Sequence, residues 1–176
     1  MRFEKRTFKN GLRCVVSTMK DTQTATLWAL FGTGSKYEIK KTNGISHFLE
    51  HLFFKGTKSR PKPGQVWEEL DRIGAQKNAF TSKEYTGYYV KAAAKHFDIG
   101  LDVVSDILLE PLFKKEEIEK ERGVILQEIA MYEDNPQRQA YELFEALLYG
   151  DQPAGWEISG TPDTVKGISR EDILLY

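Results

Sequence analysis

The sequence predicts an α+β fold in which helices pack on one side of a mainly antiparallel sheet. Two observations predict this class. Strand signals concentrate in the first 90 residues, and helical periodicity replaces them after Lys95. The sequence contains no internal repeat, low-complexity run or linker that would divide it. The 176 residues are therefore expected to form a single domain with its own hydrophobic core.

The strand signals begin with a hairpin. Two alternating runs flank Asn10-Gly11, a dipeptide that favours a tight hairpin turn. A third run, rich in β-branched and aromatic residues, ends at the glycine-rich turn that starts at Gly32. Two later runs are joined at Ser82-Lys83-Glu84. The expected strands are Arg2–Phe8, Leu12–Met19, Thr24–Phe31, Ala75–Thr81 and Tyr85–Val90.

Helix signals follow from capping residues and apolar stripes. Asn43 or Ser46 is expected to cap a helix that ends at Gly56, and Pro63 opens a helix that Gly74 closes. Later stripes predict helices across Phe97–Leu108, Lys114–Tyr132 and Tyr141–Leu148, and a short helix capped by Ser169. Residues Asp151–Gly167 are expected to form a loop with short turns.

Composition narrows the possible partners. A formal net charge of −1 gives no reason to expect nucleic acid or an anionic membrane as partner. No apolar stretch approaches the roughly 20 residues of a membrane span, and the first residues lack the apolar core of a signal peptide. A cytoplasmic location is therefore expected. The single Cys14 excludes an internal disulfide, and its alternating run predicts a buried strand residue.

The segment His47-Phe48-Leu49-Glu50-His51 contains two of the three histidines in the chain. A helix turns about 100° per residue, so the side chains of His47, Glu50 and His51 point into one sector. Two imidazoles at this spacing can bind one Zn²⁺. The nearby carboxylate of Glu50 is then free to hold a water molecule. This is the His-Glu-x-x-His arrangement with the helix direction reversed.

A catalytic zinc usually has three protein ligands and one position for water. Glu121 and Glu128 are two helical turns apart and share a face beside an apolar stripe, so either could supply a third ligand. Alternative interpretations are that the histidines are surface residues and that Glu128 is solvated. His96 stands at the expected start of a helix, where a surface or capping role is favoured.

At this point the sequence closely resembles the pitrilysin-type inverzincin metallopeptidases, the family of the mitochondrial processing peptidases and insulin-degrading enzyme. The resemblance covers nearly the whole chain, and its motifs agree in order and spacing. The matching segments are Gly34–Glu38, Asn43–Thr57, Asn78–Thr81 followed by Glu84–Tyr89, and Glu121–Glu128.

The resemblance implies a role for each matching residue. His47, His51 and Glu128 would ligate one zinc ion, and Glu50 would be the general base. Glu121 would act beside the zinc site, orienting ligands or positioning the base. Asn78, Ala79 and Phe80 would lie on an edge strand where an extended substrate adds as a further strand. The implied protein is a zinc endopeptidase that cleaves unfolded peptides.

Length is the one departure from the family pattern. Family enzymes have two halves, each with two related domains, whereas this chain corresponds to most of one N-terminal catalytic domain. It is expected to be part of a longer two- or four-domain protein, in which a second half or partner subunit completes a chamber. The chain stops before the last strands that the family domain is expected to have, and their loss would leave an exposed sheet edge. A non-catalytic zinc-binding or interaction subunit of a processing-peptidase-like complex is the alternative.

Overall fold

The computed structural model describes residues 3–176 and contains a three-stranded antiparallel sheet and a separate hairpin. The sheet has the order β3 (Thr24–Phe31), β5 (Thr86–Ala93) and β4 (Gln76–Thr81). The hairpin consists of β1 (Glu4–Thr7) and β2 (Arg13–Val16). The predicted strands all appear, somewhat shifted or shortened at their ends. The first was expected from Arg2, which lies outside the described residues.

The register of the sheet places β5 in the centre. Trp28 of β3 lies opposite Tyr89 of β5, and their rings stack with centroids 4.6 Å apart. On the other side of β5, Asn78 pairs with Tyr89 and Thr81 pairs with Thr86. Within residues 3–176, β4 pairs with β5 alone, so β4 is an edge strand of the described sheet.

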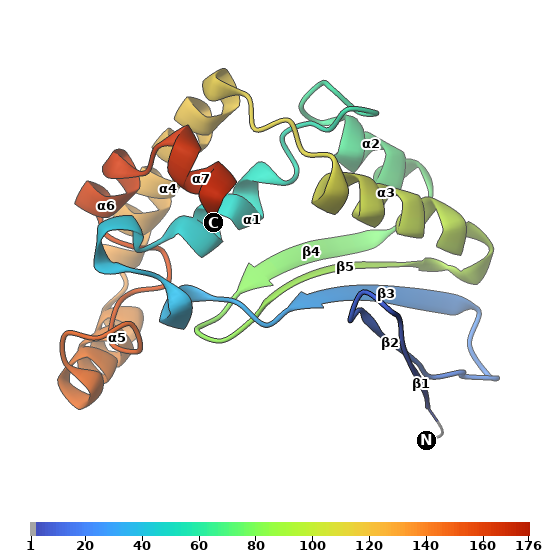
Figure 1. Ribbon diagram of the computed structural model, residues 1–176, viewed down its shortest axis with the longest axis horizontal. Coiled ribbons are helices and arrows are strands. Elements are labelled where there is room, and N and C mark those ends of the chain that lie inside the picture. Colours follow the sequence, from blue (N-terminus) through green and yellow to red (C-terminus); the bar gives the residue numbers. More distant parts are fainter. Residues whose placement is uncertain (1–2) are drawn as a thin grey trace.

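One face of the sheet is covered by α2 (Gln65–Arg72) and α3 (Phe97–Leu109), as Figure 1 shows. The central residues of both helices are buried against inward side chains of β5. Phe97 and Leu101 of the expected α3 stripe remain partly exposed. The buried residues of this core are Phe54, Val66, Leu70, Ala75, Tyr88, Val90, Ala92, Val103, Val104 and Ile107.

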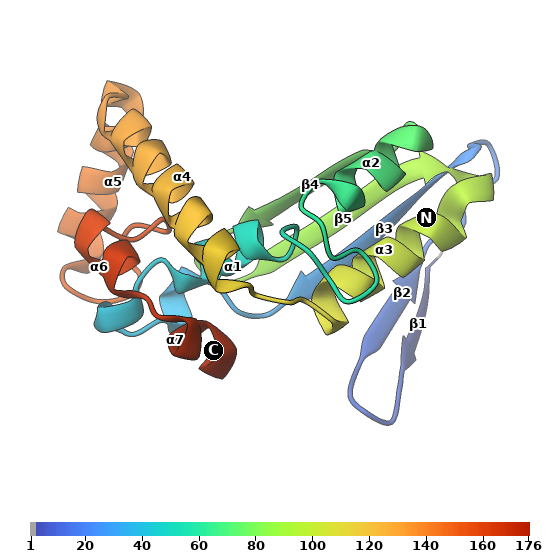
Figure 2. The ribbon, with the colours of Figure 1, turned by 90° about the horizontal axis from the view of Figure 1, so that it is seen from above.

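A second group of helices lies beyond the end of the sheet (Figure 2). It contains α1 (Ile45–Leu52), α4 (Lys115–Glu133), α6 (Pro162–Gly167) and α7 (Arg170–Leu175). Their buried residues form a core of their own: Ile45, Phe48, Leu52, Ile118, Ile125, Ile129, Val165, Ile168 and Ile173. The helices therefore form two groups, with α1 also contacting β4, and do not all pack on the sheet.

The expectation of a loop across Asp151–Gly167 was wrong in its last third, where α6 forms. Thr161 begins this helix with a reciprocal capping box to Thr164, and Pro162 occupies the first turn. The helix is short, but Val165 is fully buried against α4. Tertiary packing therefore stabilises a six-residue helix whose apolar pattern was too brief to predict it.

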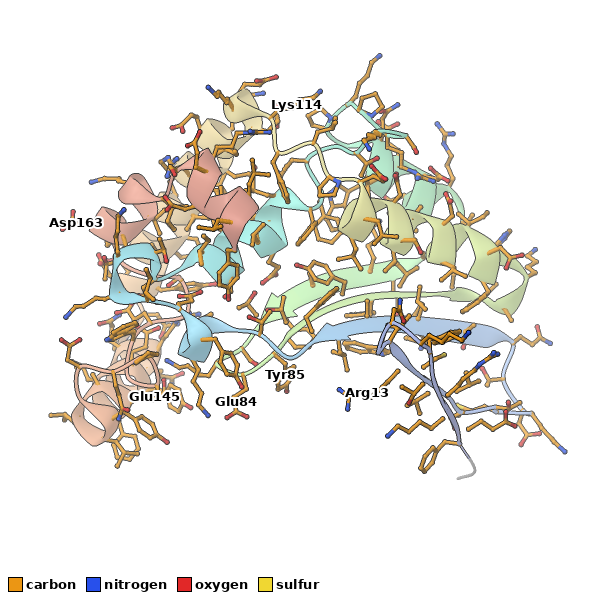
Figure 3. All side chains as sticks on the ribbon, viewed as in Figure 1. Arg13, Glu84, Tyr85, Lys114, Glu145 and Asp163 are labelled. Atoms are coloured by element: carbon orange, nitrogen blue, oxygen red, sulfur yellow. The ribbon has the colours of Figure 1, made fainter. Side chains whose placement is uncertain are left out.

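Several apolar residues are exposed. Cys14 is exposed, contrary to expectation, because the β1–β2 hairpin projects away from the sheet and all eight of its strand residues are exposed. In Figure 3 the side chains of Arg13 and Tyr85 lie on the sheet side away from α2 and α3.

The last long helix, α5 (Pro136–Tyr149), is capped by Asn135 but buries none of its residues. No helix within the described residues is long and apolar enough to cross a membrane.

Candidate metal centre

The helix that carries the histidines begins differently from the prediction. Its N-cap is Gly44 with φ 96°, and neither Asn43 nor Ser46 caps it through a side chain. The buried carboxylate of Glu38 accepts hydrogen bonds from the backbone N–H groups of Gly44 (2.7 Å) and Ser46 (2.9 Å). The Asn43 side chain donates to the same carboxylate at 2.9 Å. Glu38, six residues before Gly44, therefore supplies the anion that the positive end of α1 favours.

Gly44 is required at this position for two reasons. Its positive φ is strained for other residues. A Cβ atom here would also lie 2.6 Å from the backbone oxygen of Ser159. The start of α1 is thus packed directly against the segment that leads into α6.

Helices α1 and α4 bring three expected ligands together. The Nε2 atoms of His47 and His51 lie 3.7 Å and 3.5 Å from Oε2 of Glu128. One ligand atom from each of the three residues lies within 4.8 Å of the others. Their side chains are 12%, 21% and 20% exposed, so the group is shielded yet reachable from solvent.

These residues fit a zinc ion. Ligands on a tetrahedral zinc stand about 3.3 Å apart, because each bond is about 2.0–2.1 Å long. The two nitrogen–oxygen distances are only slightly longer than this spacing. Two imidazoles and one carboxylate also form a donor set that zinc enzymes use, with a fourth position left for water. The Nδ1 atom of His47 is buried and lacks a hydrogen-bond partner among the described residues.

Glu121 lies beside this group and contacts His51. Its carboxylate is 3.2 Å from Nδ1 of His51 and 2.6 Å from Nζ of Lys55. Burial alone would raise the pKa of Glu121, but these two contacts lower it below its usual value. An ionised Glu121 that accepts from Nδ1 leaves Nε2 of His51 directed toward Glu128. This is the arrangement that fixes a metal-binding tautomer.

The electrostatics differ between the two histidines. Burial, together with the neighbouring His51, lowers the pKa of His47 to about 4, so this ring is neutral at pH 7. Burial also disfavours a charged His51, but its hydrogen bonds with Glu121 and Glu128 raise its pKa to about 9. The same contact with His51, opposed by burial and aided by Tyr132, lowers the pKa of Glu128 to about 2. Without a metal, a proton on His51 compensates the carboxylates.

The side chain of Glu50 is hydrogen-bonded to a residue of the sheet. The hydroxyl of Thr81, the last residue of β4, donates to its Oε2 at 2.6 Å. Burial raises the pKa of Glu50, although the Thr81 hydrogen bond and the nearby His51 oppose that rise. The nearby charge of Glu128 adds to the rise in the pKa of Glu50.

The residues predicted to bind substrate lie on the edge strand β4. Asn78, Ala79 and Phe80 occupy β4, as expected, and Ala79 is directed to the same face as Thr81. His96 is the N-cap of α3 without a side-chain bond, away from the metal group.

Glu38, Thr81 and Tyr132 were not singled out from the sequence. Tyr132 donates to Glu128 four residues earlier on α4, and that helical spacing could have indicated it. Glu38 contacts Gly44 and Ser46 across an irregular segment, and Thr81 contacts Glu50 from a different element, so no periodicity marks either contact.

Known proteins that are similar to this chain belong to the same family that its motifs indicate. A family model described as "Insulinase (Peptidase family M16)" matches residues 14–162. The chain is 40% identical over 170 residues to the uncharacterized zinc protease YmxG of Bacillus subtilis, covering 97% of this chain and 41% of the relative. It is 39% identical over 168 residues to the beta subunit of the mitochondrial-processing peptidase of Rattus norvegicus, covering 96% of this chain and 34% of the relative.

Solved structures share the fold. A protease from Helicobacter pylori superimposes with a TM-score of 0.94 at 30% identity, covering 99% of this chain and 42% of that one. A peptidase M16 inactive domain from Pseudomonas fluorescens has a TM-score of 0.90 at 14% identity, over 99% of this chain and 42% of that one, and shows likeness of fold alone. The chain therefore spans less than half the length of these relatives.

Proposed function

We propose, because the chain belongs to the insulinase family of peptidases (peptidase family M16), that it is a zinc-dependent endopeptidase domain. It would hydrolyse peptide bonds in extended, unfolded peptides. The observation that carries this proposal is the convergence of His47, His51 and Glu128 on one point, with Glu50 adjacent to His51 on the same helix. Relatives whose names include zinc protease support the choice of metal.

The ligand set would be His47, His51 and Glu128, with one zinc ion per chain. When bound, zinc supplies a Lewis acid that polarises a carbonyl and lowers the pKa of a water molecule. Glu121 keeps the Nε2 atom of His51 directed at the site through its contact with Nδ1. Tyr132 donates to one oxygen of Glu128 and leaves the other, Oε2, directed at the two histidines.

Glu50 is the proposed general base. Its carboxylate takes a proton from the attacking water and then delivers it to the nitrogen of the leaving amine. Both transfers require a group whose pKa lies closer to neutrality than that of an ordinary glutamate. Partial burial raises the pKa of Glu50 in this direction.

The proposed substrate site is β4. Because this strand is an edge of the described sheet, the backbone groups of Asn78–Phe80 that do not pair with β5 would be available to an extended peptide, with the Ala79 N–H exchanging its bond to Oδ1 of Asn78. Such pairing would select unfolded segments over folded proteins. Its main-chain hydrogen bonds require an extended backbone and no particular side chain, so they would hold many sequences.

A second half or partner subunit is proposed to complete the chamber around this site. The support is that the curated relatives are more than twice as long as the matched region. The largely apolar exposed side chains of α5 also offer area for contact with further protein.

The decisive experiment compares the full-length protein with its Glu50→Gln variant. The variant should keep its zinc, measured by elemental analysis, and should lose hydrolysis of a quenched fluorogenic peptide by roughly a hundred-fold or more. Undiminished turnover by Glu50→Gln would exclude Glu50 as the base.

A non-catalytic zinc-binding or interaction subunit is the second candidate function. Its support is that the chain spans less than half of the length of its relatives. Peptide hydrolysis by the full-length protein, with and without a chelator, separates the two candidates. Chelator-sensitive cleavage supports the enzyme, whereas absent or chelator-insensitive cleavage supports the subunit.

A further inference from the structure

We propose that Thr81 is the positioning residue for Glu50, and that it ties the general base to the strand that receives substrate. This inference rests on the proposed function and deepens it. Thr81 contacts neither metal nor substrate in this proposal. It acts only through the carboxylate of Glu50.

The geometry of the contact is specific. Oγ1 of Thr81 donates to Oε2 of Glu50 at 2.6 Å, a short distance typical of a hydroxyl bonded to a carboxylate. Within residues 3–176, Oε1 of Glu50 has no hydrogen-bond partner. One oxygen is therefore anchored, and the other is available to accept a proton from water.

Thr81 is well suited to hold a flexible side chain. Glutamate has three rotatable side-chain bonds, and an untethered carboxylate would sample positions too far from the site to take a proton. The β-branched side chain of threonine has few χ1 choices. The Thr81 backbone is also fixed by pairing with Thr86 of β5.

The anchor links two elements that are distant in sequence. Glu50 lies on the helix that carries both histidines, whereas Thr81 ends the edge strand β4. A peptide added to β4 at Asn78–Phe80 would pair immediately beside Thr81. Seating of the peptide and placement of the base would then depend on the same short stretch of backbone.

Three variants test the contact. Thr81→Val removes the hydroxyl and keeps the shape, and Thr81→Ser keeps the hydroxyl. Thr86→Val is the matched control, because Thr86 lies opposite Thr81 and its hydroxyl donates to the backbone oxygen of Thr33, away from Glu50. We expect Thr81→Val to lower kcat by roughly ten- to a hundred-fold with zinc content and KM little changed. Thr81→Ser should restore most of kcat, and Thr86→Val should retain it.

A second measurement does not depend on activity. Infrared spectra of protein with ¹³C-labelled glutamate carboxylates, taken without metal and compared with Glu50→Gln, isolate the carboxylate band of Glu50. This band should shift in Thr81→Val and stay in place in Thr81→Ser and Thr86→Val. An unshifted band in Thr81→Val would overturn the proposal.

The two proposals can fail separately. If the unaltered protein shows no Glu50-dependent hydrolysis, the proposed function fails, and the infrared band still decides whether Thr81 holds Glu50. If hydrolysis depends on Glu50 but Thr81→Val keeps full kcat, the enzyme assignment stands and the positioning role of Thr81 is wrong.

Discussion

Two clusters of charged side chains in this protein have similar composition but different organisation. Each has three carboxylates and one lysine or arginine, and the first also has two histidines. The metal cluster comprises His47, His51, Glu128, Glu50, Glu121 and Lys55. The Arg60 cluster comprises Arg60, Glu69, Asp102, Asp106 and Thr57.

The Arg60 cluster is complete within the chain. The guanidinium lies 2.6 Å from both Glu69 and Asp106 and 2.5 Å from Asp102, so all three acids share one cation. Its planar fork of donors suits this multiple contact. The cluster joins the loop before α2 to both α2 and α3, and its role is to hold those helices together.

The metal cluster is not completed in this way. Lys55 contacts Glu121 alone among the three acids, whereas Glu128 faces the two histidines and Glu50 faces Thr81. Nitrogen and oxygen atoms converge at a spacing that suits a cation from outside. The comparison teaches that shared composition does not separate structural from functional clusters. What separates them is whether a permanently charged side chain occupies the centre, as Arg60 does in one cluster, whereas in the other only the titratable His51 stands between Glu121 and Glu128.

The largest expected effect is a loss of zinc affinity. Replacing His51 or Glu128 with alanine should weaken zinc affinity by more than about a hundred-fold, because even the loss of a residue that only hydrogen-bonds to a ligand costs roughly ten- to a hundred-fold. Zinc per chain after gel filtration measures this. Glu133→Ala is the control, since Glu133 is an exposed acid near the end of the same helix. Unchanged stoichiometry in either alanine variant removes that residue from the ligand set.

Removing the central cation of the other cluster should act on folding alone. Arg60→Met leaves three acids without their shared partner. We expect a loss of about 2 kcal/mol, below the value for a fully buried pair because Asp102 is 69% exposed. Zinc content should stay the same. Urea unfolding measures the change, with the exposed Arg72 of α2 changed to Met as control. A loss of zinc in Arg60→Met would contradict the division into two clusters.

A substitution at the start of α1 should have a smaller effect, and it should change both stability and zinc affinity. Glu38→Ala removes the acceptor of two backbone N–H groups, at a cost of roughly 1–2 kcal/mol. Since α1 carries both histidines, zinc affinity should also fall. Glu84→Ala is the control, because Glu84 is 61% exposed in its pair with Lys36. Stability and zinc affinity equal to those of the control would show that Glu38 does not position the helix.

The features of the site that the sequence predicts best are those whose geometry is local. The spacing of His47, Glu50 and His51 on one helix follows from helical periodicity, and the structure has that helix. The approach of Glu128 on α4 to α1 is tertiary, and it was expected mainly from the resemblance to a family. Contacts such as that of Thr81 with Glu50 depend on how a strand meets a helix, and no local pattern encodes them. The overall α+β class was predicted, whereas the division of the helices into two groups was not.

The smallest expected effect is a pH dependence of the Arg60 cluster. Burial alone would raise the pKa of Asp106, but hydrogen bonds from Thr57 and Arg60 hold it below its ordinary value. Because the folded pKa is the lower one, this stabilisation is fully present above the unfolded pKa of about 3.9 and is lost as pH falls through the folded pKa. Asp106→Asn should therefore cost about 1 kcal/mol at neutral pH and progressively less in acid. Urea unfolding of both proteins across this range measures the difference. A gap that stays constant down to the lowest pH would mean that ionised Asp106 is not the stabilising partner of Arg60.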